Sequence, residues 1–182
     1  MLFKNKYRIE SARLKEFDYS ATAWYYVTIC TKGMIDWLGK IKNEKVELSS
    51  IGKIVLEEWT RTKEIRKSVE LDEFVIMPNH LHGIIIINDT VETTGSVGLN
   101  STKVETQGSA SLQVVTQNLS NIIKGFKSAT TFRIRKECNK NFSWQPRFYD
   151  HVIRNEKSLY KIRNYIQLNP LKWEIDEYYR NK

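Results

Sequence analysis

Along the chain, stretches in which apolar residues cluster alternate with stretches in which they recur at helical spacing. Runs of aromatic and β-branched residues bounded by Gly, Pro, Asn or Ser predict extended strands. Such runs lie at 21–33, 36–43, 44–50, 69–78, 80–89 and 142–153. The runs 69–78 and 80–89 meet at Pro78 and Asn79, which predicts two antiparallel strands with a tight connection.

Apolar residues three or four positions apart predict three helices. The first begins at Ser49 or Ser50, and the second runs to about Lys136. The last begins after Asn155, whose side chain can cap it, and ends at Pro170, because the residue before a proline is pushed out of the helical region. The positions expected to face the core are Ile51, Ile54, Val55, Trp59, Thr62, Leu119, Ile122, Ile123, Phe126, Leu159, Ile162 and Ile166.

The order strand, helix, two strands, helix predicts an α+β fold, a ferredoxin-like antiparallel sheet with the helices packed on one face. We expect one domain over residues 1–182, interrupted by an insertion. Between residues 89 and 111, twelve of 23 residues are Thr, Ser or Gly and none is aromatic. Such a segment cannot bury enough apolar surface to offset its ordering entropy, which predicts a mobile loop.

Composition narrows the class of partner. The 182 residues include 29 Lys and Arg against 21 Asp and Glu, a net charge of +8. This excess favours a polyanion, either nucleic acid or an anionic membrane surface. Cys30 and Cys138 are far apart, which argues against a disulfide framework or a cysteine zinc site. No apolar run approaches the roughly 20 residues of a membrane helix, and the first 20 residues lack a signal-peptide pattern. We therefore expect a cytoplasmic protein without a membrane partner.

The stretch FVIMPNHLHGIIIIND (74–89) contains the candidate chemistry. His80 and His82 are two apart in a predicted strand, so their side chains share one face and Leu81 occupies the other. Neutral imidazole is a good ligand for first-row divalent metals. Two histidines and one oxygen ligand would leave coordination positions open, as a catalytic metal requires. A structural pair that donates to backbone carbonyls is the alternative, and the pattern alone leaves both open.

The last predicted helix offers side chains that could complete such a site. Tyr165 and Asn169 are four apart and so lie on one flank, beside the apolar stripe that includes Ile166. If this flank faces the histidine strand, it brings a phenol nucleophile and a carboxamide oxygen to the metal. In the alternative, Tyr165 extends the edge of the core and Asn169 only terminates the helix.

Three motifs occur in a familiar order. MPNHLHGI is a histidine–hydrophobe–histidine motif, LSNIIKGFKSATTFRIRK is a basic amphipathic helix, and SWQPRFYDHVIRNEKSLYKIRNYIQLNPLKW follows it. Together they resemble the HUH endonuclease superfamily, in particular its single-tyrosine, REP-associated tyrosine transposases. The resemblance covers residues 70–88 and 117–173, with an N-terminal strand at 21–30. It implies the HUH endonuclease fold.

The resemblance also implies an activity. In that family a tyrosine attacks a phosphodiester of single-stranded DNA, becomes linked to the 5′ side and releases a 3′ hydroxyl. The matching nucleophile is Tyr165, and the metal ligands are His80, His82 and Asn169, holding Mg²⁺ or Mn²⁺. The implied substrate is single-stranded DNA with a hairpin, REP-like or from an insertion-sequence end, processed at the nucleoid by a monomer or homodimer. Asp150 and His151, in the motif's YDH stretch, either orient the substrate or have a structural role.

Positive charges on the last two predicted helices are candidates for neutralising DNA phosphates. They are Lys124, Lys127, Arg133, Arg135, Lys161 and Arg163. Trp144, Phe148 and Tyr149 are candidates for stacking on unpaired bases. The alternatives are a solvated helix face for the charges and a core position for the aromatic rings.

Two other functions remain open from the sequence. A non-catalytic nucleic-acid-binding module of the same fold could retain all these residues after losing its substrate. An unrelated two-histidine metal oxidoreductase would need a carboxylate ligand, and Asp89 lies too far along the strand to supply one.

Overall fold

A computed structural model describes residues 22–88, 118–176 and 178–179 of the protein. Its elements follow the predicted order. They are β1 (Ala23–Cys30), β2 (Gly39–Lys42), β3 (Lys45–Leu48), α1 (Ser50–Ile65), β4 (Val69–Ile76), β5 (His80–Ile87), α2 (Leu119–Glu137), β6 (Tyr149–Ile153) and α3 (Glu156–Leu168), with short 3₁₀ turns at Lys32–Met34 and Trp173–Ile175. The predicted loop at 89–111 lies outside the described residues.

The main sheet has the strand order β4-β5-β1-β6, and each neighbouring pair is antiparallel. Without the β2–β3 hairpin, the element order β-α-β-β-α-β with this strand order is that of a ferredoxin-like fold. The predicted α+β class is therefore confirmed. The hairpin turns at Asn43 and Glu44, whose positive φ angles of 50° and 61° match the two-residue turn that fits the twist of paired strands.

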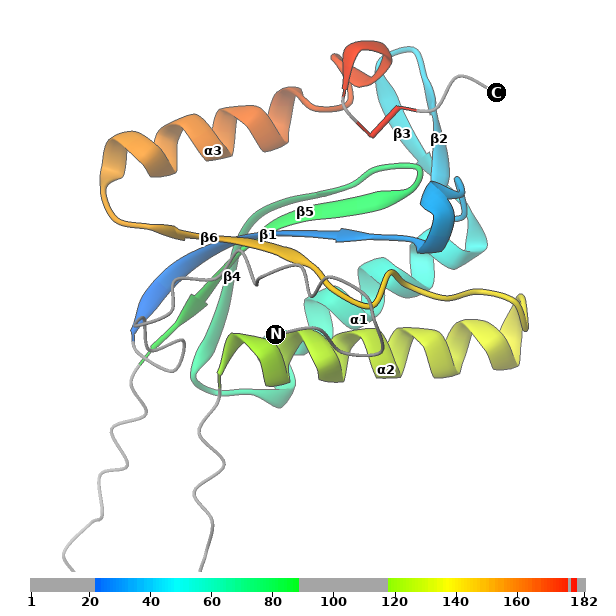
Figure 1. Cartoon of the computed structure of the whole chain (residues 1–182), viewed down its shortest axis with the longest axis horizontal. Helices are drawn as coiled ribbons and strands as arrows, with labels where there is room; N and C mark the ends of the chain where they lie inside the picture. The colour runs from blue at the N-terminus through cyan, green and yellow to red at the C-terminus, as the bar shows by residue number, and fades with distance from the viewer. Residues whose placement is uncertain (1–21, 89–117, 177, 180–182) are drawn as a thin grey trace, which may run out of the picture.

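The helices lie on both faces of the sheet, not on one as the sequence suggested. Figure 1 shows α1 and α2 against one face and α3 across the other. The reason lies in β5, which is buried along its whole length. Leu81 and Ile85 belong to the core under α1 and α2, whereas Ile84 packs with Ile166 of α3. A strand that is apolar on both sides requires cover on both sides.

Local sequence signals set the element boundaries. The Ser49 side chain accepts a hydrogen bond from the Gly52 N–H, and the Asn155 side chain accepts one from the Ser158 N–H, so both predicted helix starts are confirmed. Gly83 in β5 allows α1 to pack closely, because a Cβ there would lie 2.5 Å from the Trp59 ring.

Among the described residues, no helix has the length and apolar character needed to cross a bilayer.

An ion pair attaches α3 to the sheet. The Arg163 Nε donates to Asp72 Oδ1 at 2.9 Å, and a second guanidinium nitrogen donates to Asp72 Oδ2. The same guanidinium lies 5.7 Å from the centroid of the Trp24 ring. Asp72 lies where the β4–β5 register shifts, between Leu71 and Phe74. Irregularity in β4 thus supplies the anchor for the helix that bears Tyr165.

The Asp72–Arg163 pair predicts a pH-dependent contribution to stability. The bond from Arg163 holds the pKa of Asp72 below its ordinary value. A depressed carboxyl pKa stabilises the fold above the unfolded-state value, and this stabilisation is lost as the pH falls through the folded-state pKa. We expect Asp72→Asn to lower the free energy of unfolding at pH 7 by about 1 kcal/mol. The difference from wild type should shrink below pH ~3.9.

Urea unfolding at a series of pH values measures this difference, with Glu64→Gln on α1 as the matched carboxyl-to-amide control. A loss in Asp72→Asn that is the same at every pH, or equal to that of the control, would contradict the role given to the ion pair.

Candidate active site on the α3 face of the sheet

His80 and His82 lie side by side on the face of β5 that α3 covers. Both side chains are fully buried, and their ring centroids are 4.4 Å apart. Their Nε2 atoms are separated by only 2.9 Å. Two imidazole lone pairs cannot face each other at this distance without repulsion, so a proton or a cation must lie between them.

Asn79 fixes the tautomer of His80. Its Nδ2 donates to the carbonyl oxygens of Met34, at 3.3 Å, and Tyr178, at 2.9 Å, so its Oδ1 must face the His80 ring. That oxygen lies 2.8 Å from His80 Nδ1, which is therefore the protonated nitrogen. The Nε2 of His80 is left with a lone pair that points into the site.

The environment of His82 admits either tautomer. Its Nδ1 lies 2.7 Å from the Tyr26 hydroxyl and 2.9 Å from the Thr28 hydroxyl, and each hydroxyl can donate or accept. With the proton on Nε2, His82 donates to His80. With the proton on Nδ1, two Nε2 lone pairs converge on one point. The site can thus expose a pair of nitrogen ligands without any change in its charge.

Burial keeps both rings neutral. It lowers the pKa of His82 to about 3. The pKa of His80 is also lowered well below its ordinary value, first by burial and then by the proximity of His82. Neutral imidazoles retain the electron pairs that a cation needs, so the pair suits a metal better than it suits an anion.

The α3 flank predicted to face the histidines does meet them. The Tyr165 hydroxyl lies 3.4 Å from His82 Nε2, and the two ring centroids are 5.2 Å apart. The same hydroxyl donates to Asp176 Oδ2 at 3.3 Å. Tyr165 is 40% exposed, whereas its neighbour Ile166 is 1% exposed. Helical geometry therefore places a reachable phenol beside a buried pair of nitrogens.

Asn169 supplies an oxygen suited to a metal. The residue is 1% exposed, and its Nδ2 donates to Asp176 Oδ2 at 3.1 Å. Its Oδ1 is buried and has no hydrogen-bond partner among the described residues. Those residues also contain no group of three His, Cys, Asp or Glu placed to hold a metal ion. Two imidazoles and one amide oxygen are a donor set that would fit a divalent ion.

The segment after α3 contributes residues that sequence reasoning missed. The Tyr178 ring lies 4.6 Å from the His80 ring, and the Trp173 ring lies 5.9 Å from it. Asp176 joins Tyr165 to Asn169 through one carboxylate oxygen. The aromatic residues that follow Pro170 were the available signal, but an irregular turn has no periodicity from which to place them.

The predicted DNA-binding residues fall into separate groups. Arg133 pairs with Glu57 at 2.9 Å and with buried Glu58 at 2.8 Å, which joins α2 to α1, and Arg163 pairs with Asp72 as described. Because both guanidinium groups already have carboxylate partners, their use for phosphate binding stays a prediction that the geometry does not favour.

The remaining basic residues line two different hollows. Lys124, Lys127 and Arg135 line a groove of about 900 Å³ between α2 and residues 143–148, on the sheet face away from Tyr165. There Lys127 donates to the Gln145 and Arg147 carbonyls, and Arg135 donates to the Phe142 carbonyl at 2.9 Å. Lys161 is exposed and lines a hollow that includes Tyr165 itself.

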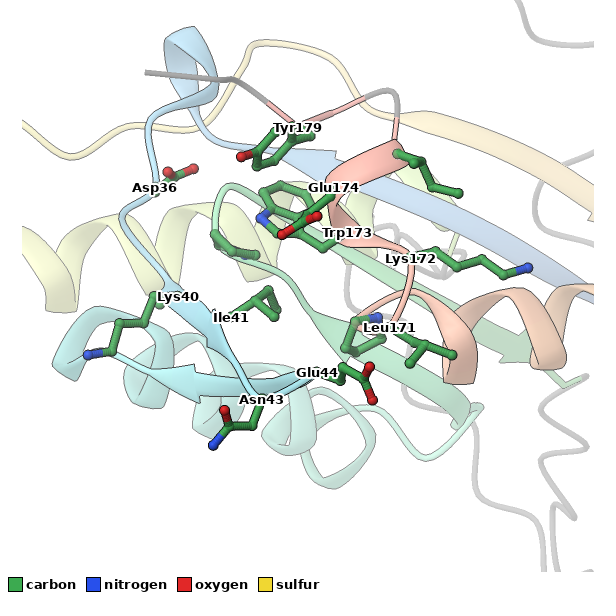
Figure 2. A pocket seen from close by; sticks show the side chains of 14 residues that line it. Asp36, Lys40, Ile41, Asn43, Glu44, Leu171, Lys172, Trp173, Glu174 and Tyr179 are labelled. Carbon is green, nitrogen blue, oxygen red and sulfur yellow. The ribbon is translucent and has the colours of Figure 1, made fainter.

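A third hollow, of about 710 Å³, lies between the β2–β3 hairpin and residues 170–179. Figure 2 shows the carboxylates of Asp36, Glu44 and Glu174 around it, with Lys40 and Lys172. Its charged lining is therefore net negative, which does not suit a polyanion.

Asp150 and His151 point to opposite faces, because they are adjacent in β6. His151 pairs in register with Tyr26 of β1 and is exposed on the α3 side. Asp150 pairs with Val27, whose side chain belongs to the core under α1 and α2. The structure therefore leaves His151 as the member of this pair that a substrate on the α3 face could reach.

Comparison with known proteins bears on this arrangement. No protein-family model matches the chain. An uncharacterised protein of Haemophilus influenzae is 37% identical over 171 residues, which span 93% of this chain and 92% of that protein. The chain and the Haemophilus protein therefore belong to one family.

A structure of a REP-associated tyrosine transposase bound to a REP hairpin matches 91% of this chain and 74% of its own, with a TM-score of 0.59 at 19% identity. The chain has the REP-associated tyrosine transposase fold. A protein of Deinococcus radiodurans proposed to be a transposase aligns with a TM-score of 0.41 at 15% identity, over 87% of this chain and 96% of its own. Within this transposase fold, the described histidine pair lies on β5 and the tyrosine on α3.

The bonds of Asn79 predict a specific stability loss. Asn79→Ala removes the acceptor of His80 and the donor to the Met34 and Tyr178 carbonyls, so we expect the free energy of unfolding to fall by about 2 kcal/mol. Urea denaturation measures this loss. Asn88→Ala is the matched control, because its amide bonds to Glu70 at an exposed position. Equal losses in the two variants would contradict the central place of Asn79.

Proposed function

We propose that this protein is a metal-dependent endonuclease and strand transferase, a transposase that acts on single-stranded DNA containing a hairpin. The reaction proceeds through a covalent phosphotyrosine intermediate at Tyr165. The observation that carries the proposal is the 3.4 Å distance between the Tyr165 hydroxyl and His82 Nε2. An exposed phenol beside two convergent, neutral, buried imidazoles is an arrangement for phosphoryl transfer more than for packing.

Tyr165 performs the bond exchange. Its Oη attacks the phosphorus of a phosphodiester, the new P–Oη bond forms, and the bond from phosphorus to the 3′ oxygen breaks. One phosphodiester replaces another, so little bond energy is lost and the free 3′ hydroxyl can reverse the step. Strand joining then needs no ATP, which is the advantage of a tyrosine nucleophile over water.

Asp176 prepares the nucleophile. A phenol with a pKa near ~10 is a weak nucleophile at neutral pH until a neighbour accepts its proton. The Tyr165 hydroxyl already donates to Asp176 Oδ2, which can take that proton as the phosphorus is attacked. The proton can then pass to the departing 3′ oxygen.

His80, His82 and Asn169 would hold the divalent cation, Mg²⁺ or Mn²⁺. The bound cation would withdraw electron density from a non-bridging phosphate oxygen and stabilise the charge that develops there. The protein's own contribution is to keep both imidazoles neutral and to orient the Asn169 side chain. Asp176 orients it, because a carboxylate that accepts a hydrogen bond from Nδ2 fixes which way the amide points.

The DNA partner is supported by charge and by the transposase fold. The structural neighbour is bound to a REP hairpin, and a net charge of +8 suits a polyanion. In this proposal Lys161, which lines the hollow beside Tyr165, neutralises phosphates there. Lys124, Lys127 and Arg135, which line the groove on the other face of the sheet, contact a second part of the DNA. Such a substrate would place the protein at the nucleoid, in the cytoplasm.

Covalent capture tests the nucleophile. Wild-type protein incubated with labelled single-stranded hairpin oligonucleotides and Mn²⁺ should give an adduct that survives denaturing electrophoresis, and EDTA should abolish it. Tyr165→Phe should give no adduct, because only the attacking oxygen is lost. Tyr160→Phe is the matched control, an exposed tyrosine of the same helix, and should react as wild type does.

An adduct that persists in Tyr165→Phe would remove the assigned nucleophile. Hairpin binding by wild type without any adduct would favour the non-catalytic binding module instead.

Direct metal binding tests the ligand set independently of activity. Isothermal titration with Mn²⁺ should show binding by wild type and none by the His80→Ala, His82→Ala double variant. Asp176→Ala should weaken binding about tenfold, as is usual for a residue that orients a ligand. Glu174→Ala, an exposed acidic residue of the same segment, should leave the affinity unchanged. Equal affinities in wild type and Asp176→Ala would contradict the orienting role.

A further inference from the structure

A hollow of about 630 Å³ opens beside the Tyr165 hydroxyl. It lies on the α3 face of the sheet, between β1, β6, α3 and the segment after α3. Its lining residues are Tyr26, Thr28, Tyr149, Lys161, Ile162, Tyr165 and Tyr178. Tyr26, Tyr165 and Tyr178 also adjoin the histidine pair, so Tyr149 and Lys161 are the lining residues that neither the metal site nor the nucleophile explains.

The rings are arranged edge to face around Tyr26. Its centroid lies 6.2 Å from Tyr149 at an interplanar angle of 69°, and 6.4 Å from Tyr165 at 84°. Tyr149 is 50% exposed, which leaves much of its ring surface open to a ligand. Tyr26 is thus held by its neighbours in the fold, and Tyr149 packs against it at the surface.

We propose that this hollow is a subsite for one unpaired nucleobase, that of a nucleotide next to the phosphate attacked by Tyr165. The base stacks on Tyr149, and Lys161 neutralises the backbone phosphate of the same nucleotide. The inference rests on the proposed function and adds to it the subsite that holds the single-stranded flank.

Position in the fold favours this occupant. β6 is an edge strand of the sheet, so an extended chain of nucleotides can pass along it without displacing another strand. Tyr149 and His151 lie on the same face of β6 and are both exposed. The single-stranded DNA would therefore run along β6 with its bases turned toward α3.

The other aromatic candidates fit a base near the nucleophile less well. Trp144 is 6% exposed and donates from Nε1 to Thr130 at 2.9 Å, and Phe148 packs against the core under α1 and α2. Both line the groove on the other face of the sheet. The hollow of Figure 2 has three carboxylates and two amines in its lining, which suits a phosphate-bearing ligand less well than the hollow beside Tyr165 does.

Equilibrium binding of two short probes tests the subsite. The first is an eight-nucleotide oligo(dT), and the second is an abasic eight-mer with the same number of phosphates. Wild-type protein should bind the first more tightly. Tyr149→Ala should weaken binding of oligo(dT) about tenfold, as expected for one lost stacking interaction, and leave binding of the abasic probe unchanged. Lys161→Ala should weaken both probes by a similar factor.

Tyr160→Ala is the matched control, because this exposed tyrosine of α3 does not line the hollow, and it should bind both probes as wild type does. Oligo(dT) carrying one 5-iododeoxyuridine should in addition photocrosslink to the peptide that contains Tyr149.

Unchanged oligo(dT) binding by Tyr149→Ala, an equal loss for both probes, or a crosslink only to the α2 groove would overturn the subsite. These measurements require no cleavage. Loss of the covalent adduct in the capture experiment would therefore count against the proposed reaction and leave this test intact.

Discussion

The close approach of two imidazole nitrogens inside the sheet is the constraint on which the α3 face depends. His80 Nε2 and His82 Nε2 lie 2.9 Å apart, and strand alternation alone puts them on one face. The buried amide of Asn79 decides that the His80 lone pair points inward. A proton satisfies this geometry in the form described, and a divalent cation would satisfy it equally. Tyr165 and Asn169 are candidates for a catalytic role only because they lie beside this pair of nitrogens.

Local rules were sufficient for most of the fold. The caps at Ser49 and Asn155, the strand pair around Asn79 and the helical spacing of Tyr165 and Asn169 each follow from neighbours in the sequence. The position of α3 could not be predicted in this way. Because β5 is apolar on both sides, its pattern is compatible with a helix on either face of the sheet. Asp176 could not be found either, since it lies in an irregular turn and its contacts are tertiary.

Some of the positive charges counted in the sequence are paired with carboxylates in the structure. Arg133 interacts with Glu57, Glu58 and Glu137, and its role is to hold α2 on α1. Arg163 holds α3 on β4. Their predicted contact with DNA stays a prediction, because an amphipathic pattern shows that a cation is on a polar face and not whether a carboxylate of another element lies opposite. A basic composition therefore supports a polyanionic partner and cannot say which residues touch it.

Asp176 creates an electrostatic condition for the proposed reaction. Its carboxylate accepts a hydrogen bond at 3.3 Å from the oxygen that would attack a phosphate, so an approaching phosphate would meet a like charge there. In the proposed reaction, positive charge that offsets the carboxylate would favour the approach of a phosphodiester to Tyr165. Lys161 lies at the exposed rim, where solvent screens it, so a cation at the histidines would have to supply most of that charge. In this scheme one acidic residue both accepts the proton of the nucleophile and couples phosphate binding to cation binding.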